Sequence, residues 1–458
     1  SALREDAGRE SAMTMQKSVS PPYWGGLLTG LLLSFFYAEH QWVMADQLQM
    51  LEKGYLGAWQ GTWLNYGNIA SAMGNVPGSL SAYVVGLPLL VWNSPYAPML
   101  FLLGLRLIAF LLFDAVVKTL FSSTVRLTFM LLFWLSPWFL YDSLLYNPSY
   151  LPLFAALHFW SAFQLREKGP FWRSFGCSVL HVAAIGMAMQ FHYSWPLLVV
   201  ISGYLLVMGR IRFNWLGILA GVALVGLSLL PYLQEMMNNQ SISREANPDA
   251  QARYIGWGLV HVYPVFKALI YWLRYSSWIF TTKLINGVEF SLFAAWPWLQ
   301  WSLVALWKGV LYGVGAVTMW LVLLANHYGW KQVRASIWRR RREQAETPRT
   351  WFALYGAAAV LAVIVCAALA PIVFSYWHLT LVFPFALFPL LLLMEHWSLG
   401  REEKVRRYLL LAACYCIAVN LVAATDSRKF SYGHSFGEQV ERYLQQHPTL
   451  QHHTKAGE

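Results

Sequence analysis

Carboxylate, amide and imidazole side chains recur where the long apolar segments of this chain end, and a reactive site could be built from these residue types. Asp46 comes first: it lies after the first apolar segment and opens an amphipathic run that ends at Gly54. A carboxylate in this place could accept a proton from an incoming hydroxyl or amine. The alternative is a structural role, since Asp46 could cap the helix with Gln49 as its capping-box partner.

Asp142 and Asn147 form a second candidate pair, in a polar stretch after the third apolar segment. Asp142 could bind substrate, or it could simply mark the end of a helix at the membrane interface. Asn147 precedes Pro148, and this pair is typical of a helix start with the asparagine as cap. The amide of Asn147 cannot act as a base, but it could bind a hydroxyl group of a sugar.

Gln190 and His192 stand between two short apolar segments, and Tyr376 and His378 stand at the end of a later one. We predict that these four side chains bind substrate, and an imidazole at this depth could hold a phosphate group. The alternatives are a structural histidine at position 192 and a belt of interfacial aromatic residues around position 376.

Arg253 and Arg274 belong to a small set of cations in a long, partly aromatic stretch. We predict that they bind an anionic lipid headgroup, and the alternative is that they are solvated surface charges. The chain has no Gly-rich phosphate loop, no CxxC pair and no HExxH motif. The sequence therefore predicts no metal ligands and no required cofactor, and it leaves metal dependence open.

Composition sets the class of protein. The chain is 57% hydrophobic and 12% charged, whereas a soluble protein carries about 25% charged residues. Its long, continuous apolar runs favour membrane-spanning helices over barrel strands. The net charge of +11 is concentrated in short loops, as in cytoplasmic loops, so nucleic acid is not a predicted partner. All four cysteines fall in apolar runs, so no disulfide is predicted.

Placing the basic loops on one side predicts an all-α polytopic membrane protein with about eleven transmembrane helices and with surface-lying helices in the first external loop. The N-terminus is then cytoplasmic, and Asp46, Asp142, His192 and His378 share the opposite side. The predicted regions are a cytoplasmic N-terminal tail (1–22), a transmembrane catalytic module (23–232) with the first external loop (38–97), a long external loop region (233–305), C-terminal transmembrane helices (306–425) and an external polar tail (426–458).

The order of these features resembles the C-type glycosyltransferase superfamily, and in particular bacterial family-39-type members related to protein O-mannosyltransferases and lipid A aminoarabinose transferases. The pieces that carry the resemblance are Asp46-Gln47, Asn75-Val-Pro-Gly-Ser-Leu-Ser-Ala-Tyr83, Tyr146-Asn-Pro-Ser-Tyr-Leu-Pro152, Gln190-Phe-His192, and Tyr376-Trp-His378 followed by Phe383-Pro384.

The resemblance implies an enzyme of the bacterial inner membrane that moves a sugar, with inversion, from a polyprenyl-phosphate carrier to a glycan, lipid or protein acceptor on the periplasmic face. It implies that Asp46 is the general base and that His378 lies near the lipid phosphate. Two positions depart from the family pattern: Gln47 replaces a frequent Glu, and Asn147 replaces an Asp. A second catalytic carboxylate therefore depends on Asp142.

Two other functions remain open. A glycan polymerase or ligase would share the external site and would differ mainly in the size of its donor. A transporter or flippase for a lipid-linked glycan would need ionisable groups or broken helices at mid-membrane, with access from both sides. The candidate polar groups lie on one predicted face, and this favours the transferase.

Overall fold

The computed structural model describes residues 21–70, 74–239, 242, 259–280, 284–340 and 346–450. These residues are mostly helical, and the only strands among them are β1 (Tyr66–Ala70) and β2 (Gly74–Pro77), which pair antiparallel. The chain is therefore an all-α membrane protein with one small hairpin. The sequence did not predict this hairpin, because Gly and Asn rather than β-branched residues dominate it.

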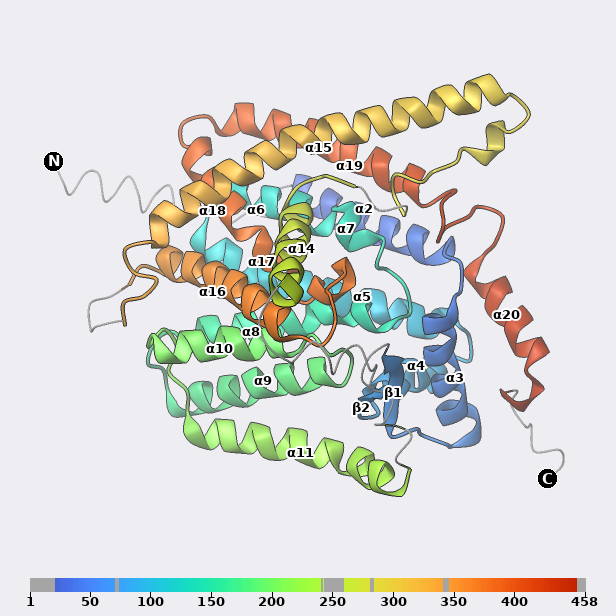
Figure 1. Ribbon diagram of the computed structural model, residues 1–458, viewed down its shortest axis with the longest axis horizontal. Helices are drawn as coiled ribbons and strands as arrows, with labels where there is room; N and C mark the ends of the chain where they lie inside the picture. Colours follow the sequence, from blue (N-terminus) through green and yellow to red (C-terminus); the bar gives the residue numbers. More distant parts are fainter. Residues whose placement is uncertain are drawn as a thin grey trace.

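The first part of the chain places two short helices at one end of a helical bundle. Helix α2 (Pro21–Glu39) leads to α3 (Ala45–Gln60), the hairpin, α4 (Leu80–Val91) and α5 (Tyr96–Leu120). Helices α3 and α4 approach closely, since a Cβ atom on Gly54 would lie 2.3 Å from the side chain of Val85. This packing holds α3 and the hairpin at the right-hand side of Figure 1.

The remaining elements complete the bundle. They are α6 (Ser123–Phe129), η2 (Met130–Trp134), α7 (Pro137–Leu140), η3 (Asn147–Tyr150), α8 (Leu151–Leu165), α9 (Phe171–Met189), α10 (Pro196–Val207), α11 (Trp215–Asn238), α14 (Leu259–Ser276), η4 (Ser291–Phe293), α15 (Pro297–Val333), α16 (Pro348–Leu369), η5 (Tyr376–Leu379), α17 (Phe383–Ala386), α18 (Phe388–Ser398), α19 (Glu402–Ala423), α20 (Phe436–Gln446) and η6 (Pro448–Leu450).

Five helices within the described ranges are long and apolar enough to cross a membrane: α5, α11, α15, α16 and α19. Other predicted spans are shorter or broken. The third one breaks after η2, where Ser136 caps the new helix α7 and Pro137 begins it. A proline cannot donate the main-chain hydrogen bond that would continue the previous helix.

The region predicted as a long external loop (233–305) is partly helical. It contains α14, which packs against α16. The sequence did not predict this helix, because Pro264 lies inside α14 and a proline usually interrupts a helix. Helix α15 begins at Pro297 and has 37 residues, so it is roughly 56 Å long and exceeds the hydrocarbon core of a bilayer.

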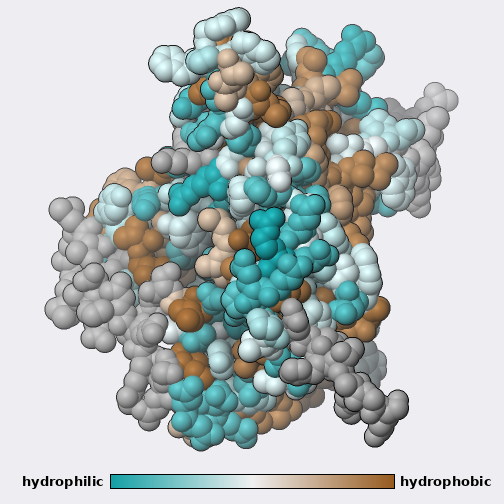
Figure 2. All heavy atoms as spheres, turned by 90° about the vertical axis from the view of Figure 1, so that its right-hand side faces the viewer, coloured by the Kyte–Doolittle hydropathy of each residue, from teal (hydrophilic) through white to brown (hydrophobic). Residues whose placement is uncertain are grey.

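Polar side chains gather at two opposite ends of the bundle. At one end, which we name the basic end, Arg349 bonds the carbonyl of Leu120 (2.7 Å) and Glu395 (2.7 Å), while Arg126 pairs with Asp114 (2.6 Å). At the other end, the cavity end, lie α3, the hairpin and α20 (Figure 1). Figure 2 faces this cavity end and shows hydrophilic residues across its centre.

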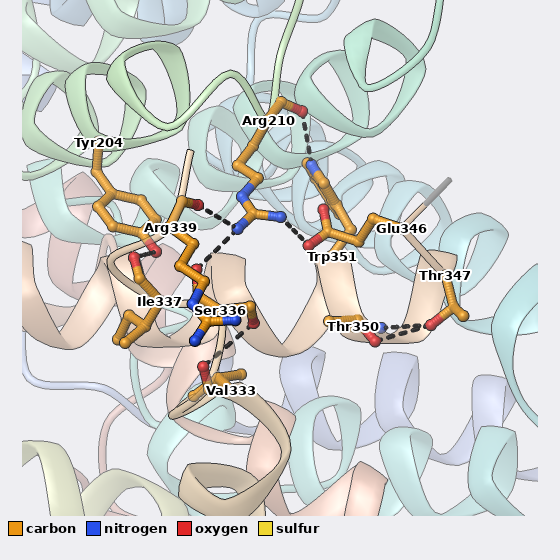
Figure 3. Close-up of polar contacts among 10 residues, drawn as sticks. All are labelled: Tyr204, Arg210, Val333, Ser336, Ile337, Arg339, Glu346, Thr347, Thr350 and Trp351. Atoms are coloured by element: carbon orange, nitrogen blue, oxygen red, sulfur yellow. Dashed lines mark hydrogen bonds and ion pairs between the residues drawn. The ribbon is translucent and has the colours of Figure 1, made fainter. Parts of the chain in front are cut away.

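Arg210 forms hydrogen bonds and an ion pair with several segments of the basic end (Figure 3). Its guanidinium donates to the carbonyls of Ser336 and Arg339, both at 2.9 Å, and pairs with Glu346. Its own carbonyl accepts from the indole N–H of Trp351 at 2.9 Å. These bonds tie Arg210, three residues after α10, to residues that follow α15, to Glu346 before α16 and to Trp351 in the first turn of α16.

Replacing Arg210 by Met should lower the melting temperature of the protein in detergent. The side chains of Arg210 and Glu346 are only 4% and 7% exposed, and removing one partner of a buried pair costs about 3–5 kcal/mol. Arg407→Met is the matched control, because its pair with Glu403 is 78% and 81% exposed and contributes little. Equal melting temperatures for both variants would contradict this role of Arg210.

Candidate functional site

Asp46 lies in the first turn of α3. The helix starts one residue earlier, at Ala45, and the side chain of Gln47 accepts from the main-chain N–H of Met44 at 2.9 Å. The prediction that Asp46 is the cap and Gln49 its partner is therefore wrong. The carboxylate of Asp46 is exposed and makes no hydrogen bond or ion pair with any described residue, and the positive end of the helix dipole favours its charge.

The hairpin supports α3 through side-chain bonds. Asn68 donates to the carbonyl of Asp46 (3.1 Å) and accepts from Lys53 (2.8 Å), while Gln49 accepts from the N–H of Ile69 (3.1 Å). Burial lowers the pKa of Lys53 to about 7, although the nearby Glu52 opposes this shift. Asp46 is thus held by two elements.

The segment predicted as an external polar tail (426–458) is folded over its described part and binds the first loop. The N–H of Trp42 donates to the carbonyl of Lys429 (2.6 Å), and the N–H of Ser431 donates to the carbonyl of His40 (2.7 Å). Phe430 is fully buried, with its ring 4.8 Å from that of Tyr37. These contacts bring Arg428 and Lys429 to the cavity end.

Helix α20 strengthens this attachment through one side chain. The amide of Gln439 donates to the carbonyl of Gln41 (2.7 Å), and its oxygen accepts from the N–H of Val43 (3.0 Å). Residues almost 400 positions apart are therefore joined immediately before Asp46.

A cavity of about 1040 Å³ opens where these elements meet. Six residues predicted from the sequence line it: Asp46, Asn147, His192, Arg274, Tyr376 and His378. Other polar residues that were not predicted as site residues also line it, among them Asn68, Tyr146, Arg428 and Lys429. One wall is apolar and comes from α10 and α16, with Leu197, Val200, Val365, Cys366 and Leu369. The cavity therefore combines a charged part with a hydrophobic part.

His192 and His378 face the cavity as neutral donors. Their rings are 5.5 Å apart, and burial lowers the pKa of His192 to about 3 and that of His378 to about 4. The Nδ1 atom of each ring accepts a main-chain N–H, from Ser194 (3.1 Å) and Ser375 (2.8 Å) respectively. A neutral ring in this state carries its hydrogen on Nε2. Neutral rings supply no positive charge, so the positive charge beside this cavity comes from arginine and lysine side chains.

Arg274, Arg428 and Lys429 supply positive charge, and none of them forms an ion pair with a described side chain. Burial lowers the pKa of Lys429, while the carboxylates of Asp142 and Asp46 act against this shift. Cations are scarce on the predicted external side, and this scarcity was the sequence signal that could have identified Arg428 and Lys429. Unpaired cations beside a cavity form a site for an anionic ligand.

Asp142 and Gln190 do not line the cavity. Asp142 is 2% exposed and accepts from the hydroxyl of Tyr146, which itself lines the cavity. Gln190 donates to Ser228 (2.9 Å) and packs on Gly78, where a Cβ atom would lie 2.1 Å from its side-chain oxygen. The geometry gives Gln190 a packing role. Arg253 lies outside the described residues.

Asn147 lines the cavity but does not cap a helix. It is the first residue of η3, after the cap residue Tyr146, and its amide donates to the carbonyl of Phe191 at 2.7 Å. Its amide oxygen is buried and has no hydrogen-bond partner among the described residues. Leaving such an acceptor unpaired costs about 1–3 kcal/mol, and a ligand hydroxyl could recover this. Among the described residues, no group of three or more His, Cys, Asp or Glu side chains could hold a metal ion.

Replacing Gln439 by Ala should loosen the attachment of the C-terminal segment to the first loop. Both side-chain bonds to that loop are lost, so we expect the amides of Trp42 and Ser431 to exchange hydrogen about tenfold faster. Hydrogen–deuterium exchange followed by mass spectrometry measures this. Gln445→Ala, at an exposed position of the same helix, is the control. Unchanged exchange in the Gln439 variant would show that other contacts hold the segment.

The chain matches no family model, no curated protein and no solved structure. Its likeness to C-type glycosyltransferases therefore stays a prediction from sequence motifs. Residues from all five motifs, which are far apart along the chain, nevertheless line one cavity: Asp46, Pro77, Asn147, His192 and His378.

Proposed function

We propose that this protein is an inverting membrane glycosyltransferase that moves a sugar from a polyprenyl-phosphate carrier to an acceptor. The observation that carries the proposal is the composition of the cavity. A free carboxylate, three cations, two neutral imidazole donors and an apolar wall line the same space. A lipid-linked sugar phosphate has complementary parts: an anion, a polar sugar and a hydrocarbon chain.

Asp46 is the proposed general base. Its carboxylate is exposed to the cavity and is not consumed by a salt bridge or a hydrogen bond with the described part of the chain. The acceptor oxygen or nitrogen attacks the anomeric carbon of the sugar, and a new bond forms there. Its proton passes to Asp46, while the bond from the anomeric carbon to the phosphate oxygen breaks and its electron pair leaves with the polyprenyl phosphate.

Arg274, Arg428 and Lys429 are the proposed phosphate ligands. Negative charge grows on the phosphate as it leaves, and fixed cations in a partly water-excluded site stabilise that charge. The Nε2–H groups of His192 and His378 add neutral donors to sugar or phosphate oxygens. This arrangement needs no cofactor in the proposed step, and metal dependence stays open.

The apolar wall is the proposed place of the polyprenyl chain. It is built from the first half of α10 and the last two turns of α16. The cavity volume of about 1040 Å³ is at the upper end of the range for ligand pockets, about 300–1,000 Å³. The polyprenyl chain can therefore begin in the cavity and continue along the helices into lipid.

We further propose that the cavity end is periplasmic and that the basic end is cytoplasmic in a bacterial inner membrane. The supporting observation is the gathering of basic residues at one end, since cytoplasmic loops are rich in Lys and Arg. We also propose the C-type fold with about eleven spans. Several of these helices are shorter than the roughly 20 residues that cross a bilayer, so their length alone does not identify them as spans.

Asp46→Asn should abolish transfer while the protein still folds. Loss of a general base typically lowers the rate by about 10²–10⁴-fold. Transfer is measured in membranes supplied with polyprenyl-phosphate sugars, by mass spectrometry of the donor. Glu52→Gln is the matched control: it lies on the same helix and bonds Tyr443 without lining the cavity. Full activity of the Asp46 variant would reject the proposal.

Arg274→Gln and Lys429→Gln should each weaken the binding of farnesyl phosphate by about tenfold or more, since hydrogen bonds to charged groups contribute about 1.5–3 kcal/mol. Isothermal calorimetry in detergent measures this affinity, and farnesol shows how much the hydrocarbon chain contributes. Arg442→Gln removes an exposed cation of α20 that is not part of the cavity. Equal affinities in all three variants would remove these cations from the site.

A further inference from the structure

Tyr146 and Asp142 form a buried pair behind the cavity wall. Tyr146 lines the cavity, while Asp142 is 2% exposed and is not among the residues that line it. The hydroxyl of Tyr146 donates to the carboxylate of Asp142. The amino group of Lys429 lies 5.6 Å from the centre of the Tyr146 ring. A phosphate held by Lys429 would therefore lie beside Tyr146.

The surroundings of Asp142 are buried and hydrogen-bonded. The hydroxyl of Ser149 donates to the main-chain carbonyl of Asp142, and Arg106 donates to the carbonyl of Ser149 at 2.9 Å. The charged and titratable groups that face Asp142 come from every element packed around it: Arg106 of α5, Tyr141 after α7, Tyr275 of α14, Tyr376 of η5 and Lys429 of the C-terminal segment.

We infer that Tyr146 is a phosphate-binding residue whose hydroxyl becomes available to the ligand when Asp142 takes up a proton. This inference rests on the proposed function. With Asp142 ionised, the Tyr146 hydrogen is committed to the carboxylate, and the phenol oxygen offers only lone pairs to the cavity. With Asp142 protonated, the carboxylic acid donates to the phenol oxygen. The phenol hydrogen then turns to a phosphate oxygen.

The protonation of Asp142 falls in an accessible pH range. Burial raises the pKa of this carboxyl to about 6, although Tyr146, Arg106 and Lys429 oppose the shift. The proton taken up comes from water; it forms one new O–H bond on the carboxyl group, and no covalent bond breaks in the protein or the ligand. Lowering the pH through this range therefore converts the wall of the cavity from an acceptor to a donor.

The test measures farnesyl phosphate binding to the purified full chain in detergent at about pH 5.5 and about pH 7.5, on either side of the carboxyl pKa. Asp142→Asn imitates the protonated acid at both values, because its amide can donate to the phenol oxygen. The wild type should bind more weakly at the higher pH, where Asp142 is ionised, whereas this variant has no such carboxyl group. The wild-type Kd divided by the Kd of the variant should therefore be about tenfold larger at the higher pH. The titration of the phosphate itself cancels in this ratio.

Tyr146→Phe should bind weakly at both pH values and lose the same pH dependence. Tyr150→Phe is the matched control, because the Tyr150 hydroxyl is buried without a partner in the described part of the chain and its ring packs on Phe191. This variant should follow the wild type. If the ratio of the wild-type Kd to the Kd of Asp142→Asn does not change with pH, this inference alone is overturned. The hydrogen bond between Tyr146 and Asp142 then has a structural role only. If the wild type binds farnesyl phosphate no better than farnesol at either pH, the proposed function fails and this inference fails with it.

Discussion

The cost of placing charge in a bilayer governs how this protein is built. Charged side chains are expensive in hydrocarbon and must be paired or moved to the ends of the helices. All five ion pairs among the described residues belong to the basic end. At the cavity end, Asp46, Arg274, Arg428 and Lys429 have no such partner. Charge is thus satisfied internally at one end and left available for a ligand at the other.

The prediction that the basic loops share one side of the membrane rested on local patterns of charge and apolar segments, and the sidedness stays a prediction. The polar C-terminal segment could not be understood in the same way. The bonds from Trp42 to Lys429 and from Gln439 to Gln41 join distant positions, and no periodicity signals such a contact. Helix breaks were also difficult to predict, since Pro137 begins a new short helix whereas Pro264 lies inside α14.

The candidate site was predicted in part for the same reason. Asp46, His192 and His378 end apolar segments on one side, so the sequence alone placed them together, and they share the cavity. Asp142 and Gln190 follow the same pattern, but neither reaches it. The difference is set by packing: Asp142 is buried and bonded to Tyr146, and Gln190 fills the space that Gly78, with its φ angle of 83°, leaves open. Side-chain direction at the end of a helix depends on such neighbours.

The central claim is that the cavity transfers sugar from a polyprenyl phosphate. Its most direct test is to incubate the purified protein in lipid nanodiscs with a panel of polyprenyl-phosphate sugars and to follow each donor by mass spectrometry. The proposal predicts that at least one donor is converted to free polyprenyl phosphate by the wild type and not by Asp46→Asn. Equal conversion of that donor by both proteins would contradict it, as would a wild type that consumes none of the panel.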